Sequence, residues 1–395
     1  MSKNINILYL CQNYNSFIKD QIEVLSKNFN EVNVLVRHNY FSELGPVFKI
    51  NYLLQFTERR LLDLENKPNN VNVYLNSLFY APTNRQYKNL GEKHFYTVEK
   101  IIRNKGIRFD LTHSHFIWSS GYVGMKLKNK YNTPFIVTAH GFDVYDLPFR
   151  DDDWSNTIRN ILNSSDYIIT VSKKNLEYIN KLGINNNVEI IPNGYKKELF
   201  YKMDKIKCRN LLSIPKDKII LLNIGHIIKV KGHIFLIEAL EKLVQIRNDF
   251  ICYVIGEGNL KNMLFKIIEK KKLSKYIIFI DYVDHKNIPI WMNSADLFIL
   301  PSLNEGNPTV LVESLAVGLP FIGSNVGGIP EIVISDKYGF LCKPGDSNEL
   351  FSAINKGMDN NWDHEGIIKH AEKYSWDILC NKISEIYSKV MDHYD

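Results

Sequence analysis

The stretch that decides the fold runs from Leu297 to Glu313 and reads LFILPSLNEGNPTVLVE. Its opening residues are apolar and end at a proline, which predicts a short buried strand. Asn307 is a good N-cap and Pro308 a good first helical residue, so we expect a helix from Pro308 to about Val317. The unpaired amides at such a helix start bind anions, which predicts a site for a phosphate or a diphosphate.

The same alternation of strand and helix patterns extends outward in both directions. In the first half, short β-branched runs predict strands at 5–10, 32–36, 71–75, 111–115, 135–138, 167–171 and 188–191. In the second half they predict strands at 219–224, 251–255, 277–280, 297–300 and 321–323. Helical stretches between them include 17–27, 92–103, 173–181 and 234–246. Because βαβ alternation occurs twice, we predict an α/β protein with two doubly wound Rossmann-like domains facing a central cleft.

The predicted junction between the domains is the polar segment 192–217, which opens with the turn signal Pro192-Asn193-Gly194. A chain of 395 residues suits two domains of about 200 residues each. We therefore expect an N-terminal domain over 1–195 and a C-terminal domain over 196–374. The segment 375–395 carries a strongly amphipathic helical pattern, and we expect it to pack back toward the N-terminal domain.

Composition narrows the function classes. The five cysteines are scattered without a CxxC pair, which argues against a disulfide framework or a zinc site and favours a reducing compartment. No apolar run approaches the roughly 18 residues of a membrane span, and the segment 5–10 is too short for a signal peptide. The net charge of +6 fits a solvated surface, an anionic membrane or phosphorylated substrates. No nucleic-acid-binding signature is present, so no nucleic acid partner is expected.

Two more loops follow predicted strands of the second half, where open α/β sheets bind their ligands. Gly225 directly follows the first of these strands. Gly232 holds Lys231 at a helix start, where its ammonium suits a charge-assisted bond to a diphosphate. The alternative is a solvated basic loop. Gly256 and Gly258 follow the next strand, although a lone GxG is weak support for a site.

Glu305 and Glu313 lie beside the predicted anion site. A diphosphate repels carboxylates, so their natural partners are uncharged hydroxyls such as those of a sugar. The alternative is that Glu305 is a solvated loop residue and Glu313 a surface residue of the helix.

Together these motifs resemble glycosyltransferase family 4, a large retaining family with the GT-B fold. Glu305 and Glu313 stand at the two ends of its E-x7-E signature. The resemblance covers nearly the whole second domain, at 225–232, 256–258, 295–302, 305–320 and 327–331.

The resemblance implies a role for each motif residue. Glu305 orients the hydroxyls of the donor sugar, Glu313 holds the ribose, and Lys231 holds the diphosphate. It also implies substrate-binding positions at Gly225, Gly256, Gly306, Asn307, Thr309 and Val310, with Val283 beside the base.

One position departs from the family. His226 stands where the family usually has arginine. A neutral imidazole carries no full charge at pH 7, although a bound diphosphate would raise its pKa.

In the first half, the segment Thr138 to Asp143 follows a predicted strand and resembles the family's HGxD segment. The resemblance implies that His140 faces the donor sugar near the anomeric carbon as a third catalytic residue. It places Asp143 nearby as a substrate-binding residue. Strand alternation puts His113 and His115 on one face, where we expect mainly structural roles, with a cleft role for His115 as the alternative.

Three other segments are informative. The loop 11–16 lacks the glycines that the family often has there, which puts a donor-phosphate contact in doubt and argues against a dinucleotide-binding dehydrogenase. The acidic run 151–153 precedes a helix and is expected to serve the helix start rather than a metal. Residues 40–64 fit a buried helix pair, a membrane-facing amphipathic surface or an acceptor-binding element.

The sequence thus predicts a retaining glycosyltransferase that moves a sugar from a UDP- or GDP-sugar to a hydroxyl of a glycan or lipid-linked acceptor. The expected setting is cell-surface polysaccharide or glycoconjugate synthesis in the cytoplasm, with peripheral contact at the inner face of the membrane. No metal or other cofactor is expected. The alternatives are a non-catalytic sugar-nucleotide-binding partner subunit and a sugar-nucleotide epimerase.

Overall fold

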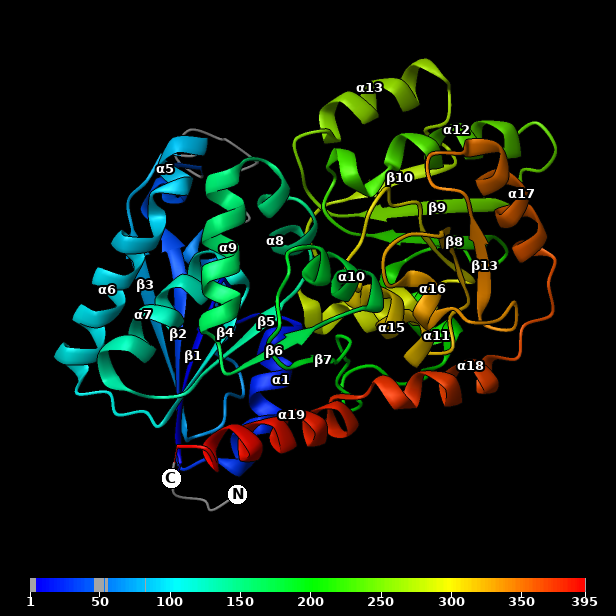
Figure 1. The fold of residues 1–395 in the computed structure, drawn as a ribbon. Coiled ribbons are helices and arrows are strands. Elements are labelled where there is room, and N and C mark those ends of the chain that lie inside the picture. Colours follow the sequence, from blue (N-terminus) through cyan, green and yellow to red (C-terminus); the bar gives the residue numbers. More distant parts are fainter. Residues whose placement is uncertain (1–4, 46–52, 54–55, 82, 395) are drawn as a thin grey trace. The chain divides into compact units, whose positions relative to one another are not determined.

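The computed structural model describes residues 5–45, 53, 56–81 and 83–394. The chain divides into two compact units. Unit 1 contains residues 1–192 and 376–395, and unit 2 contains residues 193–375. Each unit is a parallel sheet covered by helices (Figure 1), which confirms the predicted α/β class.

Unit 1 is built on a seven-stranded parallel sheet in the order β3-β2-β1-β4-β5-β6-β7. Its strands are β1 (Asn6–Cys11), β2 (Glu31–Asn39), β3 (Val71–Leu78), β4 (Leu111–His115), β5 (Phe135–Ala139), β6 (Tyr167–Thr170) and β7 (Val188–Ile190). All seven lie where the β-branched runs predict them. Chain order reverses beside β1, which places the loops after β1 and β4 at the usual ligand-binding edge of such a sheet.

The helices of unit 1 cover both faces of this sheet. They are α1 (Phe17–Leu25), α4 (Glu58–Leu61), α5 (Asn84–Lys88), α6 (Leu90–Lys105), α7 (Tyr122–Tyr131), α8 (Phe142–Tyr145), α9 (Asp152–Ser164), α10 (Lys173–Lys181) and α19 (Trp376–Met391). Side chains alternate along β1, so Leu8 and Leu10 pack against α6 and α7. Ile7 and Tyr9 face the other way and pack against α1 and α19.

The last helix therefore completes the core of the first unit. In α19, buried side chains recur at helical spacing: Trp376, Leu379, Cys380, Ile383, Ile386, Tyr387 and Val390. This stripe joins the buried residues of α1 and of β1 in one cluster. Removing α19 would expose the side chains of α1 and β1 that pack against it.

Unit 2 is built on a six-stranded parallel sheet in the order β10-β9-β8-β11-β12-β13. Its strands are β8 (Ile219–Ile224), β9 (Phe250–Ile255), β10 (Ile277–Ile280), β11 (Leu297–Leu300), β12 (Phe321–Ser324) and β13 (Gly339–Cys342). Sequence patterns predict all of these except β13. That strand reads GFLC and contains no β-branched residue, so it lacks the pattern that marks the other strands.

The helices of unit 2 also form two layers (Figure 1). They are α11 (Lys205–Leu212), α12 (His233–Leu243), α13 (Lys261–Lys270), α14 (Ile288–Ser294), α15 (Thr309–Ala316), α16 (Ile329–Ile332), α17 (Ser347–Met358) and α18 (His364–Ala371). Helices α12, α13 and α17 share one apolar cluster, and α14, α15 and α18 share the other.

The expected start of the helix at residue 308 needs a correction. Helix α15 begins at Thr309 with Pro308 at the N-cap, and no side chain caps it. The Asn307 side-chain oxygen instead accepts a hydrogen bond from the Asn193 amide at 3.0 Å. The Asn193 side chain returns one to the Asn307 carbonyl at 2.8 Å. Asn307 therefore ties its loop to the first residues of unit 2 and is unavailable as the cap.

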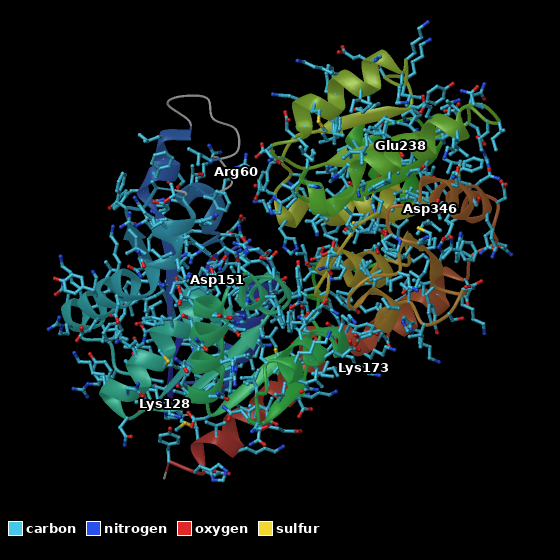
Figure 2. The ribbon with its side chains drawn as sticks, turned by 45° about the horizontal axis from the view of Figure 1, so that its top comes forward. Arg60, Lys128, Asp151, Lys173, Glu238 and Asp346 are labelled. Atoms are coloured by element: carbon cyan, nitrogen blue, oxygen red, sulfur yellow. The ribbon has the colours of Figure 1, made fainter. Side chains whose placement is uncertain are left out.

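The acidic run at 151–153 serves a helix start, as predicted. Asp151, which Figure 2 labels, is the N-cap of α9. Its carboxylate accepts a hydrogen bond from the Trp154 amide at 2.9 Å. Lys88 forms ion pairs with Asp151 and Asp153, each at 2.9 Å. These carboxylates therefore have structural partners.

The structure describes only part of the segment 40–64, for which the sequence allows a buried helix pair, a membrane-facing surface or an acceptor-binding element. Residues 46–52 and 54–55 lie outside the described residues, so that choice stays open. Within the described part, Leu61 is buried, whereas Tyr40, Phe56 and Leu64 are exposed. No described helix is both long and apolar enough to span a bilayer.

Candidate functional site

The centre of the site in unit 2 is an ion pair between the loops that follow β8 and β11. The ammonium of Lys231 lies 2.6 Å from Oε1 of Glu305. The Ser302 hydroxyl donates to the same oxygen at 2.6 Å. Glu305 is only 8% exposed, so these two partners take the place of the water that surrounds an exposed carboxylate. Within the described residues no donor reaches Oε2 of Glu305, which leaves that oxygen for a ligand.

Two glycines let the loops approach closely enough to form this pair. Gly232 has a φ of +66°, and a Cβ there would lie 2.0 Å from the Pro301 carbonyl oxygen. Gly327 has a φ of +55°, and a Cβ there would lie 1.7 Å from the Glu305 carbonyl oxygen. A side chain at either position would push the loop after β11 away.

We expect Gly327→Ala to destabilise unit 2 by about 1–3 kcal/mol and to lower activity, because the new Cβ displaces the backbone of Glu305. Urea unfolding followed by circular dichroism measures the loss. The matched control is Gly345→Ala, since Gly345 also has a positive φ of +75° but its Cβ would meet nothing closer than 3.6 Å. Equal losses of stability and activity in both variants would contradict the role given to Gly327.

The start of α15 lies directly after this ion pair. The amides of Thr309 and Val310 are in the first turn, where the helix itself supplies no acceptor. The partial positive charge of these amides adds to the full charge of the Lys231 ammonium in the loops beside Glu305. This arrangement suits a ligand that carries a diphosphate next to hydroxyl groups.

Glu313 is buried in the second turn of α15, contrary to the alternative of a surface residue. Its Oε1 lies 2.9 Å from Nε2 of His285, in the loop after β10. The His285 ring packs on Phe200, with ring centroids 5.2 Å apart. Glu313 is therefore paired with a side chain from another loop of the same unit.

The remaining predicted positions of unit 2 line the neighbouring strand ends. The Gly225 amide donates to Ile255 at 3.0 Å, and the Gly256 amide donates to Ile280 at 3.2 Å. The Gly306 carbonyl accepts from Gly328 at 2.9 Å. Val283 is half-buried against the core, in the same loop as His285. The structure thus brings the motif loops of unit 2 to one edge of one sheet.

His226 has a side chain that remains exposed in the loop after β8. Desolvation of its ring by neighbouring atoms, followed by the nearby charge of Lys231, lowers its pKa. The imidazole is therefore neutral at pH 7 in the absence of a ligand. The charge that arginine would supply here is missing.

In unit 1, the predicted residue His140 lies in a row of imidazoles. Nε2 of His140 and Nδ1 of His115 are 3.0 Å apart, and the two rings are stacked. Burial, followed by the proximity of His115, lowers the pKa of His140 well below its usual value. Nδ1 of His140 is buried without a hydrogen-bond partner among the described residues. Nε2 of His115 is likewise buried without a partner among the described residues, so this row has two nitrogens that a ligand could satisfy.

Asp143, the other predicted residue of this segment, makes two contacts with the backbone. Its Oδ2 accepts from the Ile117 amide at 2.6 Å and its Oδ1 accepts from the Gly141 amide at 3.0 Å. The carboxylate is buried, and burial raises its pKa. Asp143 therefore joins Gly141, the neighbour of His140, to Ile117 after β4, and its contact with the substrate stays a prediction.

The glycine-free loop after β1 is filled by a tyrosine. Tyr14 is fully buried, and its backbone pairs with Leu61 and Asp63 through two hydrogen bonds of 2.7 Å. This pairing holds the loop against the segment that follows α4.

Sequence reasoning missed Ser302 and His285, the partners of the two motif glutamates. Ser302 could have been found, because it lies directly after a predicted strand, where ligand-binding groups gather. His285 carried no such signal. Within the described parts of the chain, no group of three or more His, Cys, Asp or Glu side chains is placed to hold a metal ion.

Comparisons with known proteins identify the family of the chain. The family model described as "Glycosyl transferases group 1" matches residues 204–374. The model described as "Glycosyltransferase Family 4" matches residues 53–199. An uncharacterised glycosyltransferase of Methanocaldococcus jannaschii is 28% identical over 304 residues, which are 74% of this chain and 79% of that protein. A Bacillus subtilis glycosyltransferase named for teichuronic acid biosynthesis is 28% identical over 275 residues, which are 69% of this chain and 66% of that protein.

Solved structures share the architecture. Sucrose-phosphate synthase of Thermosynechococcus elongatus has a TM-score of 0.77 at 19% identity, over 98% of this chain and 100% of that chain. Anabaena HepE, solved in complex with UDP-glucose, has a TM-score of 0.73 at 18% identity, again over 98% and 100%. At such identities the likeness establishes the fold alone. The two family matches, the named relatives and this fold together show that the chain belongs to glycosyltransferase family 4, is a glycosyltransferase, and has the GT-B fold.

Proposed function

We propose that this enzyme transfers a sugar from a nucleoside diphosphate sugar to an acceptor hydroxyl with retention of anomeric configuration. The observation that carries the proposal is the ion pair of Lys231 with Glu305 at the start of α15, eight residues before Glu313. The cation and the helix amides suit a diphosphate, and the carboxylates suit the hydroxyls on either side of it.

The proposed chemistry is electrostatic. The bond between the anomeric carbon and the diphosphate oxygen breaks, and its electron pair goes to the diphosphate. Lys231 and the first amides of α15 stabilise that charge as it develops. Glu305 and His140 orient the sugar, which becomes oxocarbenium-like. The acceptor oxygen then bonds to the anomeric carbon on the face that the diphosphate leaves, and a phosphate oxygen takes the acceptor's proton.

The donor we propose is a UDP- or GDP-sugar. The solved complex of HepE with UDP-glucose supports the uridine nucleotide. The relative named for teichuronic acid biosynthesis supports a glycan or lipid-linked acceptor in cell-surface polysaccharide synthesis. A cytoplasmic location with contact at the inner face of the membrane is part of this proposal. The exposed Tyr40, Phe56 and Leu64 support that contact.

The first experiment is thermal unfolding of the purified protein with UDP, GDP, ADP and their common sugar conjugates. A ligand at about 100 times its dissociation constant adds about 2.7 kcal/mol of stability, which shifts the melting temperature by several degrees. We expect a shift with one nucleotide series. Absence of a shift with every series would contradict the proposed donor site.

A second assay distinguishes transfer from the alternatives. A transferase releases nucleotide faster when its acceptor is added, whereas an epimerase returns the sugar still attached to the nucleotide. We expect UDP release from UDP-glucose to rise on addition of a competent glycan acceptor. Binding with no turnover under any acceptor would favour the non-catalytic partner subunit.

The replacement of the family's arginine by His226 gives a prediction about pH. A bound diphosphate favours the protonated imidazole, so binding takes up a proton and affinity for UDP rises as pH falls. In His226→Arg the charge is permanent. We therefore expect His226→Arg to bind UDP about tenfold more tightly than the wild type does at about pH 8. Between about pH 8 and about pH 6, its affinity for UDP should change less than that of the wild type. Isothermal titration calorimetry measures both.

The control for this prediction is His226→Gln, which carries no charge at any pH. The phosphate of UDP also takes up a proton near this pH range, but this contributes equally to the pH dependence measured for all three proteins. Only the wild type should show the additional gain of affinity at low pH. An identical pH dependence in wild type and His226→Gln would remove His226 from the phosphate site.

A further inference from the structure

A buried polar network connects the last helix to the strands of unit 1. The Tyr387 hydroxyl of α19 lies 2.6 Å from Nδ1 of His113 and 2.9 Å from the Tyr9 hydroxyl. Nε2 of His113 lies 2.7 Å from the Thr138 hydroxyl of β5. All four side chains are buried. The His113 ring is thus held at both nitrogens, from a helix on one side and a strand on the other.

The network continues from His113 to His140 through a stack of rings. The His113 and His115 rings are nearly parallel, with centroids 4.8 Å apart and planes at 24°. His115 also stacks on Tyr9, with centroids 6.1 Å apart. Its Nδ1 is then 3.0 Å from Nε2 of His140. The Tyr387 hydroxyl therefore begins a continuous series of contacts that ends at the proposed catalytic imidazole.

We propose that Tyr387 is a positioning residue for the transfer reaction, and that its hydroxyl fixes the imidazole row that orients His140. This inference rests on the role of His140 in the proposed function. Tyr387 lies 247 positions from His140 in the sequence and belongs to the helix that returns to unit 1 after unit 2.

The hydroxyl acts through ring orientation. Burial lowers the pKa of His115 to about 3 and that of His113 well below its usual value, so the imidazoles of the row are neutral. A neutral imidazole has one donor and one acceptor nitrogen, and its partners determine which is which. Without the Tyr387 hydroxyl, Nδ1 of His113 would be a buried nitrogen without a partner, and the ring would lose one of its two anchors.

The test is a double-mutant cycle with Tyr387→Phe and His140→Asn, measured as the rate of UDP release from UDP-glucose. Residues in one polar network couple measurably, so we expect Tyr387→Phe alone to lower kcat about five- to tenfold. It should leave KM for UDP-glucose unchanged. In the His140→Asn background, Tyr387→Phe should have no further effect on kcat. Equal losses in both backgrounds would overturn the proposal.

The matched control is Ile383→Val, one turn earlier in α19. Ile383 is buried in the same cluster but has no polar group, so its variant should lower the melting temperature and leave kcat intact. If Ile383→Val lowers kcat as much as Tyr387→Phe at equal loss of stability, the hydroxyl has no special role and the proposal fails.

A spectroscopic measurement makes the test independent of turnover. In protein labelled with 15N-histidine, the ring nitrogens of His140 are assigned by their loss in His140→Asn. Tyr387→Phe should shift these signals, and Ile383→Val should not; unchanged His140 signals in Tyr387→Phe would overturn the inference. If His140→Asn itself leaves UDP release intact, the proposed function of His140 fails instead.

Discussion

Glu305→Ala should lower the rate of sugar transfer by about 10²–10³-fold while UDP binds at least as tightly as before. Glu305 holds the sugar in our proposal, so transfer loses an oriented charge. In the free enzyme, however, its Oε1 is paired with Lys231 at 2.6 Å. Removing the carboxylate frees the ammonium for the diphosphate, and affinity for UDP should rise. Steady-state rates and calorimetric titration with UDP measure the two effects.

The opposite signs of these effects make the result specific. General damage to the loop would weaken both transfer and binding. Glu305→Gln is the control, because its amide can still accept the hydrogen bond from Ser302 but cannot form the ion pair. It should bind UDP as Glu305→Ala does, with a smaller loss of rate. Transfer at the wild-type rate in Glu305→Ala would refute the assignment.

Lys231→Ala should raise the dissociation constant of UDP about 10- to 100-fold, because a charge-assisted hydrogen bond to the diphosphate is lost. It should also lower kcat, since the same charge stabilises the leaving group. The variant leaves Glu305 without its ion-pair partner in a site where that carboxylate is only 8% exposed. Some loss of stability is therefore expected, and urea unfolding quantifies it separately from the binding measured by calorimetry.

The control for this variant lies two residues earlier. Lys229 is in the same short 3-10 turn and is exposed, so Lys229→Ala removes an equal charge from the same loop. We expect it to change affinity for UDP less than twofold at physiological salt, because an exposed charge at that distance is screened. If both variants weaken UDP binding equally, the loop acts through its overall charge and Lys231 has no specific contact.

Much of the fold could be predicted from the sequence, because apolar β-branched runs of ordinary length mark the strands. The exceptions have physical causes. Strand β13 contains no β-branched residue and so lacks the pattern of the other strands. The start of α15 differs from the prediction because Asn307 is engaged by Asn193, a tertiary contact that local cap preference does not reveal. Local patterns report local energies, whereas this helix start depends on a residue 114 positions away in the chain.

The site shows the same division. Glu305, Glu313 and Lys231 could be found because motif spacing marks them, and the structure brings their loops to one sheet edge. The partners of the two glutamates differ in this respect. Ser302 lies three residues before Glu305 in the same loop, whereas His285 comes from the loop after β10, and no sequence spacing relates it to the motif.

The placement of α19 has a consequence for how the protein is made. Unit 1 needs this helix to close one face of its sheet, yet the ribosome synthesises α19 only after all of unit 2. Unit 2 is contiguous in the chain, whereas unit 1 is assembled from two segments that unit 2 separates. Part of one apolar face of unit 1 therefore stays open until α19 packs, and an open apolar face is where an incompletely folded chain aggregates.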